Sequence, residues 1–289
     1  MRKIELLLIV FSISSILVTG CAQKTDHLLT IKTKYGDMVA VLYDETPKHK
    51  ANFIKLAKEH YFDSLLFHRV IQGFMIQGGD PESKKSPAGK RLGNGGPGYT
   101  IDAEFNPKLF HEKGSLSAAR LSDQMNPQKA SSGSQFYIVQ GKKHTDSEIK
   151  LDQQKFGMAL QQFFQKPENK TYYDSISRFY QTRDEKGYEL YILALKPIVE
   201  SQLGISVERE VSPEKIKAYT TVGGTPILDG EYTVFGKVIK GLDIIDKIAG
   251  EAKNQDDRPE QDILMQVTVE EMPRRKIEKN YGYTYPETK

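Results

Sequence analysis

Apolar and polar residues alternate over many short runs before residue 140 and again after residue 230, and this two-residue period is typical of β-strands. Two segments instead repeat their apolar residues at helical spacing. One follows Thr46-Pro47 and places Phe53, Leu56 and Ala57 on one face, and the other is residues 242–249. Short antiparallel strands with two helices predict a mainly β fold, a closed antiparallel β-barrel of about eight strands capped by two helices. The predicted strands are residues 28–33, 38–43, 65–71, 74–77, 99–103, 115–119, 134–139, 233–239 and 263–269.

The pattern becomes helical between residues 145 and 219. Thr145 and Glu148 have the spacing of a capping box, Pro167 ends the first helical stretch, and Ser212-Pro213 starts the last one. Because strands flank this block, we expect an insertion in a loop of the barrel, where added length costs little closure entropy. The predicted organisation is a barrel of residues 28–144 and 220–272, a helical insertion at residues 145–219, and a charged, loose tail at residues 273–289.

The first 20 residues have the features of a secretory signal peptide. Arg2 and Lys3 precede an apolar run over residues 4–18, which is shorter than a membrane-spanning helix. Residues 18–21, Val-Thr-Gly-Cys, resemble a bacterial lipobox, in which the cysteine is lipidated; the alternative is a plain signal peptide that contains a cysteine. The lipobox interpretation predicts an acylated Cys21 and a tether over residues 21–27. The protein would then be exported and anchored by lipid to the bacterial cell envelope, in the periplasm or at the outer membrane.

The composition excludes several function classes. The chain has 289 residues, of which 27% are charged and 38% hydrophobic, and its formal net charge of +3 gives no support to nucleic-acid binding. One cysteine permits no intramolecular disulfide, and the six histidines show no metal-ligand spacing, so no metal site or hydrolase constellation is predicted. Residues 93–98 match G-x-G-x-x-G, but no strand precedes them in a βαβ unit and Pro97 blocks the required helix.

Long ordered motifs of the chain resemble those of the cyclophilins. Residues 67–80, Phe-His-Arg-Val-Ile-Gln-Gly-Phe-Met-Ile-Gln-Gly-Gly-Asp, are similar to the family's signature stretch. Residues 46–53 resemble its first helix, residues 114–119 and 132–138 its two central strands, and residues 228–238 the strand that closes the site. The resemblance covers nearly all of residues 28–141 and 222–270. It implies a cyclophilin-like barrel with peptidyl-prolyl cis-trans isomerase activity.

This reaction makes modest demands on a protein. Rotation about a peptide bond has a barrier of ~18–20 kcal/mol because the nitrogen lone pair is delocalised, and X-Pro bonds populate both isomers. Catalysis needs an apolar pocket for the proline ring and a hydrogen-bond donor that meets the proline nitrogen as conjugation is lost. It needs no nucleophile, general base, metal or cofactor.

The resemblance implies a role for each residue of this site. In cyclophilins the residue that matches Arg69 is the catalytic donor, and the residue that matches Gln77 hydrogen-bonds to the substrate backbone. Arg120 matches a groove residue that acts mainly through its main chain. The other matches are Phe74, Met75, Tyr137 and Leu228 in the pocket wall, and Ala119 and Gln135 in the adjoining groove.

Four residues of this region differ from the family's pattern or need a separate interpretation. Tyr137 occupies a position that is usually phenylalanine, and its hydroxyl is expected to reach water at the pocket rim. Ile227 and Tyr232 are also expected to contact substrate. They lie where many cyclophilins have tryptophan and histidine, so substrate preference and cyclosporin affinity are open. The reaction needs no acid or base, and we therefore expect a structural hydrogen-bonding role for His68.

The sequence thus predicts an isomerase that assists the folding of exported proteins, with proline-containing polypeptides as its partners. A weakly active binding module of the same fold, docking a partner through the insertion, is the alternative. The insertion is rich in aromatic residues, which either engage clients or only pack its helices together. No pattern in the chain indicates its oligomeric state.

Overall fold

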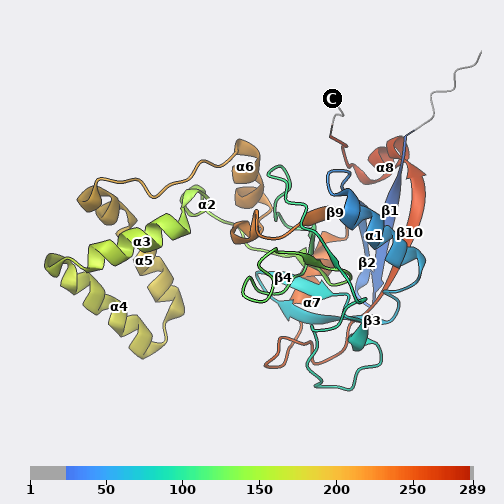
Figure 1. The fold of residues 1–289 in the computed structure, drawn as a ribbon, viewed down its shortest axis with the longest axis horizontal. Coiled ribbons are helices and arrows are strands. Elements are labelled where there is room, and N and C mark those ends of the chain that lie inside the picture. The colour runs from blue at the N-terminus through green and yellow to red at the C-terminus, as the bar shows by residue number, and fades with distance from the viewer. Residues whose placement is uncertain (1–23, 287–289) are drawn as a thin grey trace, which may run out of the picture.

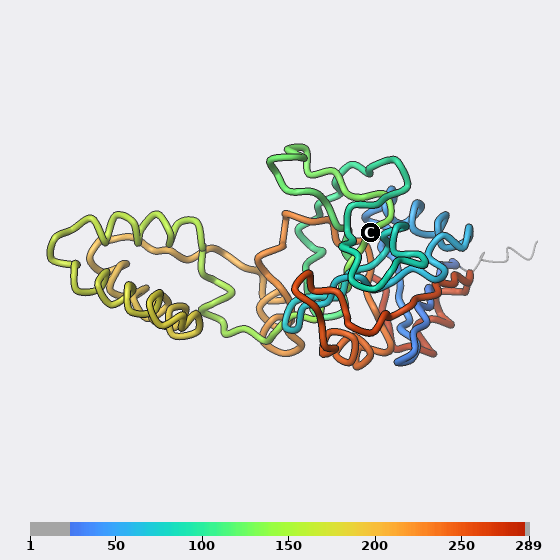
Figure 2. The backbone as a smooth tube through the Cα atoms, turned by 90° about the horizontal axis from the view of Figure 1, so that it is seen from below, coloured from blue at the N-terminus to red at the C-terminus, as the bar shows by residue number. Residues whose placement is uncertain are grey.

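The computed structural model of the protein describes residues 24–286, and eight of its strands close a barrel in which every pair is antiparallel (Figures 1 and 2). The predicted fold class is therefore confirmed. The strands around the barrel are, in order, β1 (Thr25–Thr33), β10 (Leu264–Pro273), β3 (Leu65–Ile71), β4 (Met75–Gly78), β8 (Phe136–Val139), β6 (Ser115–Ala118), β9 (Val234–Lys240) and β2 (Gly36–Leu42). The predicted strand at residues 99–103 is only β5 (Thr100–Ile101), which pairs outside the barrel with β7 (Ser131–Ser132).

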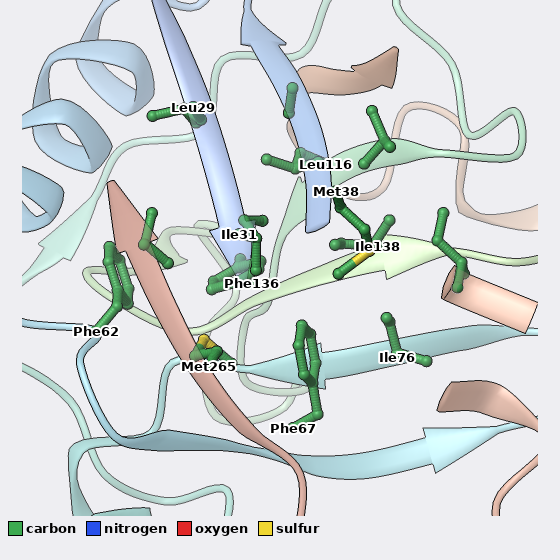
Figure 3. Packing of buried hydrophobic residues seen from close by; sticks show 14 of the residues in the cluster. Leu29, Ile31, Met38, Phe62, Phe67, Ile76, Leu116, Phe136, Ile138 and Met265 are labelled. Atoms are coloured by element: carbon green, nitrogen blue, oxygen red, sulfur yellow. The ribbon is translucent and has the colours of Figure 1, made fainter. Parts of the chain in front are cut away.

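The period-two pattern fills the barrel interior. Leu29 and Ile31 of β1 are fully buried, as are Met38 and Ala40 of β2, and all four belong to the main hydrophobic core. Figure 3 shows such side chains from facing strands packed against one another. Burial of each large apolar side chain contributes about 1.5–3 kcal/mol, so this interior supplies the rigid wall on which an outer-face site can be built.

Both predicted barrel helices bury their apolar face in this core. Helix α1 (Pro47–Lys58) begins at proline and places Phe53 in contact with the rings of Phe62 and Phe136, at centroid distances of 4.7 and 5.2 Å. Helix α7 (Leu242–Ala249) buries Ile244, Ile245, Ile248 and Ala249.

Between β8 and β9, residues 146–221 form five α-helices and a short 3₁₀ turn, in the segment predicted to be helical. The capping box of Thr145 and Glu148 is present, but it starts a separate short helix, and Asp152 caps the next one. The elements are α2 (Asp146–Lys150), α3 (Gln153–Phe164), η2 (Pro167–Asn169), α4 (Lys170–Thr182), α5 (Glu185–Leu203) and α6 (Pro213–Thr221).

Helices α3, α4 and α5 form a lobe, here defined as residues 153–206, that projects from the barrel, whereas α2 and α6 lie between the lobe and the barrel (Figures 1 and 2). The lobe's own core contains Phe156, Phe163 and Leu195. Its two chain ends meet at a narrow neck, where the Asp152 amide donates to the Val207 carbonyl at 2.9 Å. The lobe is therefore a separately packed unit joined to the barrel through this neck and through an exposed Lys142–Glu189 ion pair at 3.7 Å.

The expectation of a loose tail after residue 273 is wrong for the residues described. Helix α8 (Arg274–Tyr281) follows β10 directly and buries Ile277 completely in a small cluster with Leu28 and Met272. The Arg274 guanidinium lies over the Tyr285 ring, 4.3 Å from its centroid. The charged composition of this segment did not indicate that one apolar side chain is buried there. It also did not indicate that several tyrosines pack on the outside of β1 and β2.

The predicted signal peptide and Cys21 lie outside the described residues. Within residues 24–286, no helix combines the length and the apolar character needed to cross a membrane. Over the same range, no cluster of His, Cys, Asp and Glu side chains is large enough to hold a metal ion.

Candidate functional site

Strand register places the first site residues in one row across the outer face of the barrel. Arg69 of β3 lies opposite Gln77 of β4, and Gln77 lies opposite Tyr137 of β8. Side chains alternate between the two faces of a strand, so Ile76 points into the barrel core while its neighbours Met75 and Gln77 point outward. The signature stretch therefore supplies the core and the site from alternate residues.

The outward residues form an apolar cluster separate from the barrel core. Met75, Tyr137 and Val139 are its buried members, and Phe74, Ala119, Leu228 and Tyr232 pack around them. Except for Val139, all of these line a cavity of about 270 Å³ on the outside of the barrel. Leu228 comes from the 3₁₀ turn η3 (Pro226–Leu228), which directly precedes β9 in the chain. The cavity thus has an apolar floor assembled from β4, β8 and η3.

Arg69 contributes a cation to the wall of this cavity. Its side chain is 41% exposed, its Nη1 donates to Gln77 Oε1 at 3.3 Å, and its Nε lies 3.6 Å from Asp257 Oδ2. The carboxylate and the amide hold the guanidinium on the outer face, beside the apolar floor. A charged donor and an apolar pocket therefore lie side by side.

Gln135 has a supporting position rather than the predicted place in the groove. It is only 6% exposed and does not line the cavity. Its Oε1 accepts from Gln77 Nε2 at 3.0 Å, and its Nε2 donates to the carbonyls of Gly93 and Gly95 at 2.9 and 2.7 Å. Gln135 therefore orients Gln77 and fixes the loop that crosses above it.

Arg120 lines the cavity, and its side chain is held there by several partners. Its side chain is 5% exposed, its Nε donates to the Glu231 carbonyl at 2.9 Å, and its guanidinium forms ion pairs with Asp123 and Glu231. The guanidinium also lies 4.5 Å from the ring centroid of Tyr232. These contacts hold the Tyr232 ring nearly perpendicular to that of Tyr137, at a centroid distance of 6.0 Å.

The Tyr137 hydroxyl does not reach water at a rim, so that expectation is wrong. Tyr137 is 4% exposed, and its hydroxyl oxygen lies 3.0 Å from Nε2 of the fully buried His111. Burial raises the pKa of the phenol well above its usual value. The ring forms the predicted wall while its polar end is held from inside the protein.

Ile227 is not brought to the cavity, although it was predicted to contact substrate. It is 61% exposed and lies outside the cavity lining, next to Leu228, which is part of that lining. Consecutive residues of a tight turn point in different directions, which the linear motif could not resolve.

His68 lies at the inner edge of the cavity and is 3% exposed. Neither ring nitrogen has a hydrogen-bond partner among the described residues, so the expected structural hydrogen bonds are not found there. Burial lowers the pKa of His68 to about 4, against the raising effect of the nearby Asp80 carboxylate. The imidazole is therefore neutral at physiological pH.

Two loops that sequence reasoning missed complete the cavity. The glycine-rich loop contributes residues 91–94, and the loop after α7 contributes Asp256 and Arg258. Arg258, only 3% exposed, joins the two loops by donating from Nη1 to the carbonyls of Pro87 and Lys90, both at 2.9 Å. No local pattern marks this contact, because its partners are about 170 residues apart in sequence.

Comparison with known proteins adds independent information. The family model described as "Cyclophilin type peptidyl-prolyl cis-trans isomerase/CLD" matches residues 28–163 and 165–269. A Staphylococcus epidermidis protein assigned by name as a peptidyl-prolyl cis-trans isomerase is 30% identical over 254 residues, which cover 86% of this chain and 94% of that protein. A Streptococcus pyogenes protein assigned by name as a bifunctional phosphatase/peptidyl-prolyl cis-trans isomerase is 32% identical over 252 residues. That match covers 85% of this chain but only 39% of the streptococcal protein.

A solved structure also has a similar fold. It is a crystal structure of a Cryptosporidium parvum cyclophilin type peptidyl-prolyl cis-trans isomerase, with a TM-score of 0.50 and 20% sequence identity. The match covers 86% of this chain and 98% of that chain. The likeness therefore extends over most of the chain.

Proposed function

Because the chain belongs to the cyclophilin family of peptidyl-prolyl cis-trans isomerases, we propose that it accelerates X-Pro isomerisation in exported polypeptides as they fold. Exchange between X-Pro isomers takes tens to hundreds of seconds without a catalyst, slow enough to limit folding. An isomerase outside the cytoplasm would relieve this limit for newly exported chains. The substrates are unfolded or partly folded segments that present proline in an accessible, extended form.

The proposed mechanism is non-covalent stabilisation of the twisted amide. The proline ring enters the cavity and packs on its apolar floor of Met75, Tyr137 and Leu228, which holds one side of the X-Pro bond. As the amide twists, the proline nitrogen regains its lone pair and becomes a hydrogen-bond acceptor. The Arg69 guanidinium donates to this nitrogen, and a donor that acts only on the twisted form lowers the barrier without tightening ground-state binding.

The single observation that carries this proposal is the juxtaposition of Arg69 with the apolar floor. A lone surface arginine would usually be only a solvated cation, and lone apolar residues would usually be core. Here Gln77 accepts from the arginine at 3.3 Å, and Gln77 is in turn bonded to Gln135. The donor is therefore held in place before substrate binds, which is what electrostatic stabilisation of a transition state requires.

The folding role is tested with a protein whose refolding is limited by proline isomerisation. Catalytic amounts of the protein should raise the slow refolding rate in proportion to its concentration and leave faster phases unchanged. Binding of the refolding chain without acceleration of the slow phase would instead favour the alternative of a binding module.

We place this activity at the bacterial cell envelope, on the basis of the sequence alone. The support is the basic start, the apolar run and the lipobox-like residues 18–21. Acylation of Cys21 would anchor the protein, because two or three acyl chains together bind a bilayer firmly. Exported proteins pass this surface before they fold, which suits the proposed substrates.

Cys21→Ser is expected to abolish incorporation of radiolabelled palmitate and to release the protein from the membrane fraction or leave it unprocessed. The reason is that the substitution removes the thiol to which the lipid would be attached. The measurement is labelling of growing cells followed by fractionation. Absence of label in the wild-type protein would refute the lipidation of Cys21 and favour the alternative, a plain signal peptide that contains a cysteine.

The lobe is proposed to widen the contact with large clients. Most of its aromatic residues pack its own helices, including Phe156 and Phe163. However, Tyr173 and Tyr180 are 55% and 70% exposed, and Leu190 is 60% exposed. Exposed tyrosines offer apolar area with few rotamers to immobilise, which suits weak binding of many unfolded sequences.

A further inference from the structure

A buried polar network reaches the pocket wall from the helical insertion. The Tyr137 hydroxyl lies 3.0 Å from Nε2 of His111, and Nδ1 of His111 lies 3.0 Å from Oδ1 of Asp229. The rings of His111 and Tyr137 are nearly parallel, with an interplanar angle of 11°. The wall of the proposed proline pocket is thus bonded through a histidine to a carboxylate that does not itself line the cavity.

The carboxylate of Asp229 is also bonded to helix α6. Its Oδ1 accepts from the Tyr219 hydroxyl at 2.8 Å and from the His111 backbone amide at 2.9 Å, and its Oδ2 accepts from Lys215 Nζ at 3.0 Å. Tyr219 and Lys215 are both residues of α6. Two side chains of the insertion therefore bind one largely buried carboxylate beside the site.

The charge states of the network assign the direction of each hydrogen bond. Burial lowers the pKa of His111 and outweighs the opposing effect of Asp229, so the imidazole is neutral. Burial alone would raise the pKa of Asp229, but hydrogen bonds from His111 and the charge of Lys215 lower it, so the carboxylate is ionised. Nδ1 then donates to Asp229, and Nε2 accepts from the Tyr137 hydroxyl.

Helix α6 is fixed to the barrel independently of the lobe. Tyr219 is fully buried and packs edge-on against Phe110 at a centroid distance of 5.6 Å, and its carbonyl accepts from the His144 amide at 3.0 Å. Close packing of the returning chain requires glycine at position 224, where a Cβ atom would lie 2.3 Å from the His111 carbonyl oxygen. The end of the insertion is therefore built into the wall's support.

We infer that His111 and Asp229 are positioning residues for Tyr137, and that α6 completes them through Tyr219 and Lys215. The inference deepens the proposed function and rests on its proline pocket. The network holds the Tyr137 ring in one orientation against the proline ring, since Nε2 of a neutral, Nδ1-protonated His111 offers one acceptor in one direction. Helix α6, at the end of the insertion, then supports the pocket wall independently of any role of the lobe.

Tyr219→Phe tests this inference because it removes one hydroxyl and keeps the ring packing. We expect kcat/KM for a short X-Pro peptide to fall roughly three- to tenfold. Asp229→Asn replaces the charged acceptor of the network by a neutral amide and should lower kcat/KM by about tenfold or more. The matched controls are Tyr281→Phe on α8 and Asp243→Asn on α7, which alter groups of the same chemistry outside the cavity lining and should leave kcat/KM unchanged.

A merely structural role is distinguished by a double-mutant cycle. In a Tyr137→Phe background, Tyr219→Phe should cause no further loss, because its effect passes through the Tyr137 hydroxyl. Additive losses would overturn the inference, as would unchanged activity of Tyr219→Phe. The ring ¹⁵N shifts of His111 supply a second readout: the neutral Nδ1-protonated form is expected, and the imidazolium or the other tautomer at neutral pH would contradict it.

Failure of the inference and failure of the proposed pocket give different results. If Arg69→Ala leaves the peptide activity intact, the pocket assignment fails whatever the Tyr219 variant does. If Arg69→Ala abolishes activity while Tyr219→Phe and Asp229→Asn do not reduce it, only the positioning role fails. Should Asp229→Asn prove too unstable to purify, Tyr219→Phe still decides the question.

Discussion

Arg69→Ala is expected to lower kcat/KM for a short X-Pro peptide by about ten- to a hundredfold while the barrel stays folded. A hydrogen bond from a charged donor is worth about 1.5–3 kcal/mol, and its removal raises the barrier by the whole of this energy if the bond forms only in the twisted amide. The fold should survive because the Arg69 side chain is 41% exposed on the outside of the barrel. Peptide turnover and circular dichroism together measure both parts of the expectation.

Arg91→Ala is the matched control for this experiment. Arg91 also lines the cavity, but its side chain is 80% exposed and its nearest carboxylate, that of Asp256, is 3.9 Å away. The loss of a loosely held cation should change kcat/KM little. Equal losses in the two variants would indicate a general effect of positive charge on substrate binding, and wild-type turnover of Arg69→Ala would refute its catalytic role.

Removal of the lobe is expected to slow client refolding several-fold and to leave peptide turnover unchanged. The structure defines where to cut, because the chain ends of the lobe meet where Asp152 bonds to Val207 at 2.9 Å. A short Gly-Ser linker in place of residues 153–206 keeps α2 and α6, and therefore keeps Tyr219 and the network beside the pocket. The deletion would expose Leu151 and Val207, which the lobe buries. The substitutions Leu151→Ser and Val207→Thr make these two positions polar.

A full-length variant with Tyr173→Ser and Tyr180→Ser controls for the deletion. Both side chains are exposed, so the lobe should fold while its contact surface becomes more polar. The account predicts the same selective loss in client refolding, of smaller size. A loss on peptide and client alike would mean that the lobe only supports the pocket, and no loss on either would leave it a scaffold extension.

Much of the barrel could be predicted from sequence because its rules are local. Alternation predicted strands at residues 28–33 and 38–43, and the structure pairs these two strands, with Thr33 opposite Gly36 at the turn. Proline at the start of α1 and the apolar spacing of α7 gave those helices close to their observed bounds. Most of the predicted cavity residues are also brought together, because Arg69, Phe74, Met75 and Gln77 are fixed in register by one short hairpin.

The rest depends on contacts between distant segments, which a single sequence does not encode locally. The partner of the Tyr137 hydroxyl is 26 residues away, and Asp229 is 118 residues from His111. Arg258 joins the two loops of the cavity by donating to the carbonyls of Pro87 and Lys90, about 170 residues earlier in the chain. The prediction for the tail was wrong because the burial of Ile277 depends on apolar residues on the outer faces of β1 and β2. Leu28 and Val39 are two of these residues, and they are distant from Ile277 in sequence.

The account's central claim is tested most directly by the rate of cis-trans exchange in a short X-Pro peptide, measured by NMR exchange spectroscopy without a coupled enzyme. Substoichiometric wild-type protein should bring the exchange from the uncatalysed range of tens to hundreds of seconds to a second or faster. The Arg69→Ala variant at the same concentration should lose most of that acceleration. Exchange at the uncatalysed rate in the presence of folded wild-type protein would contradict the claim that this pocket is an isomerase site.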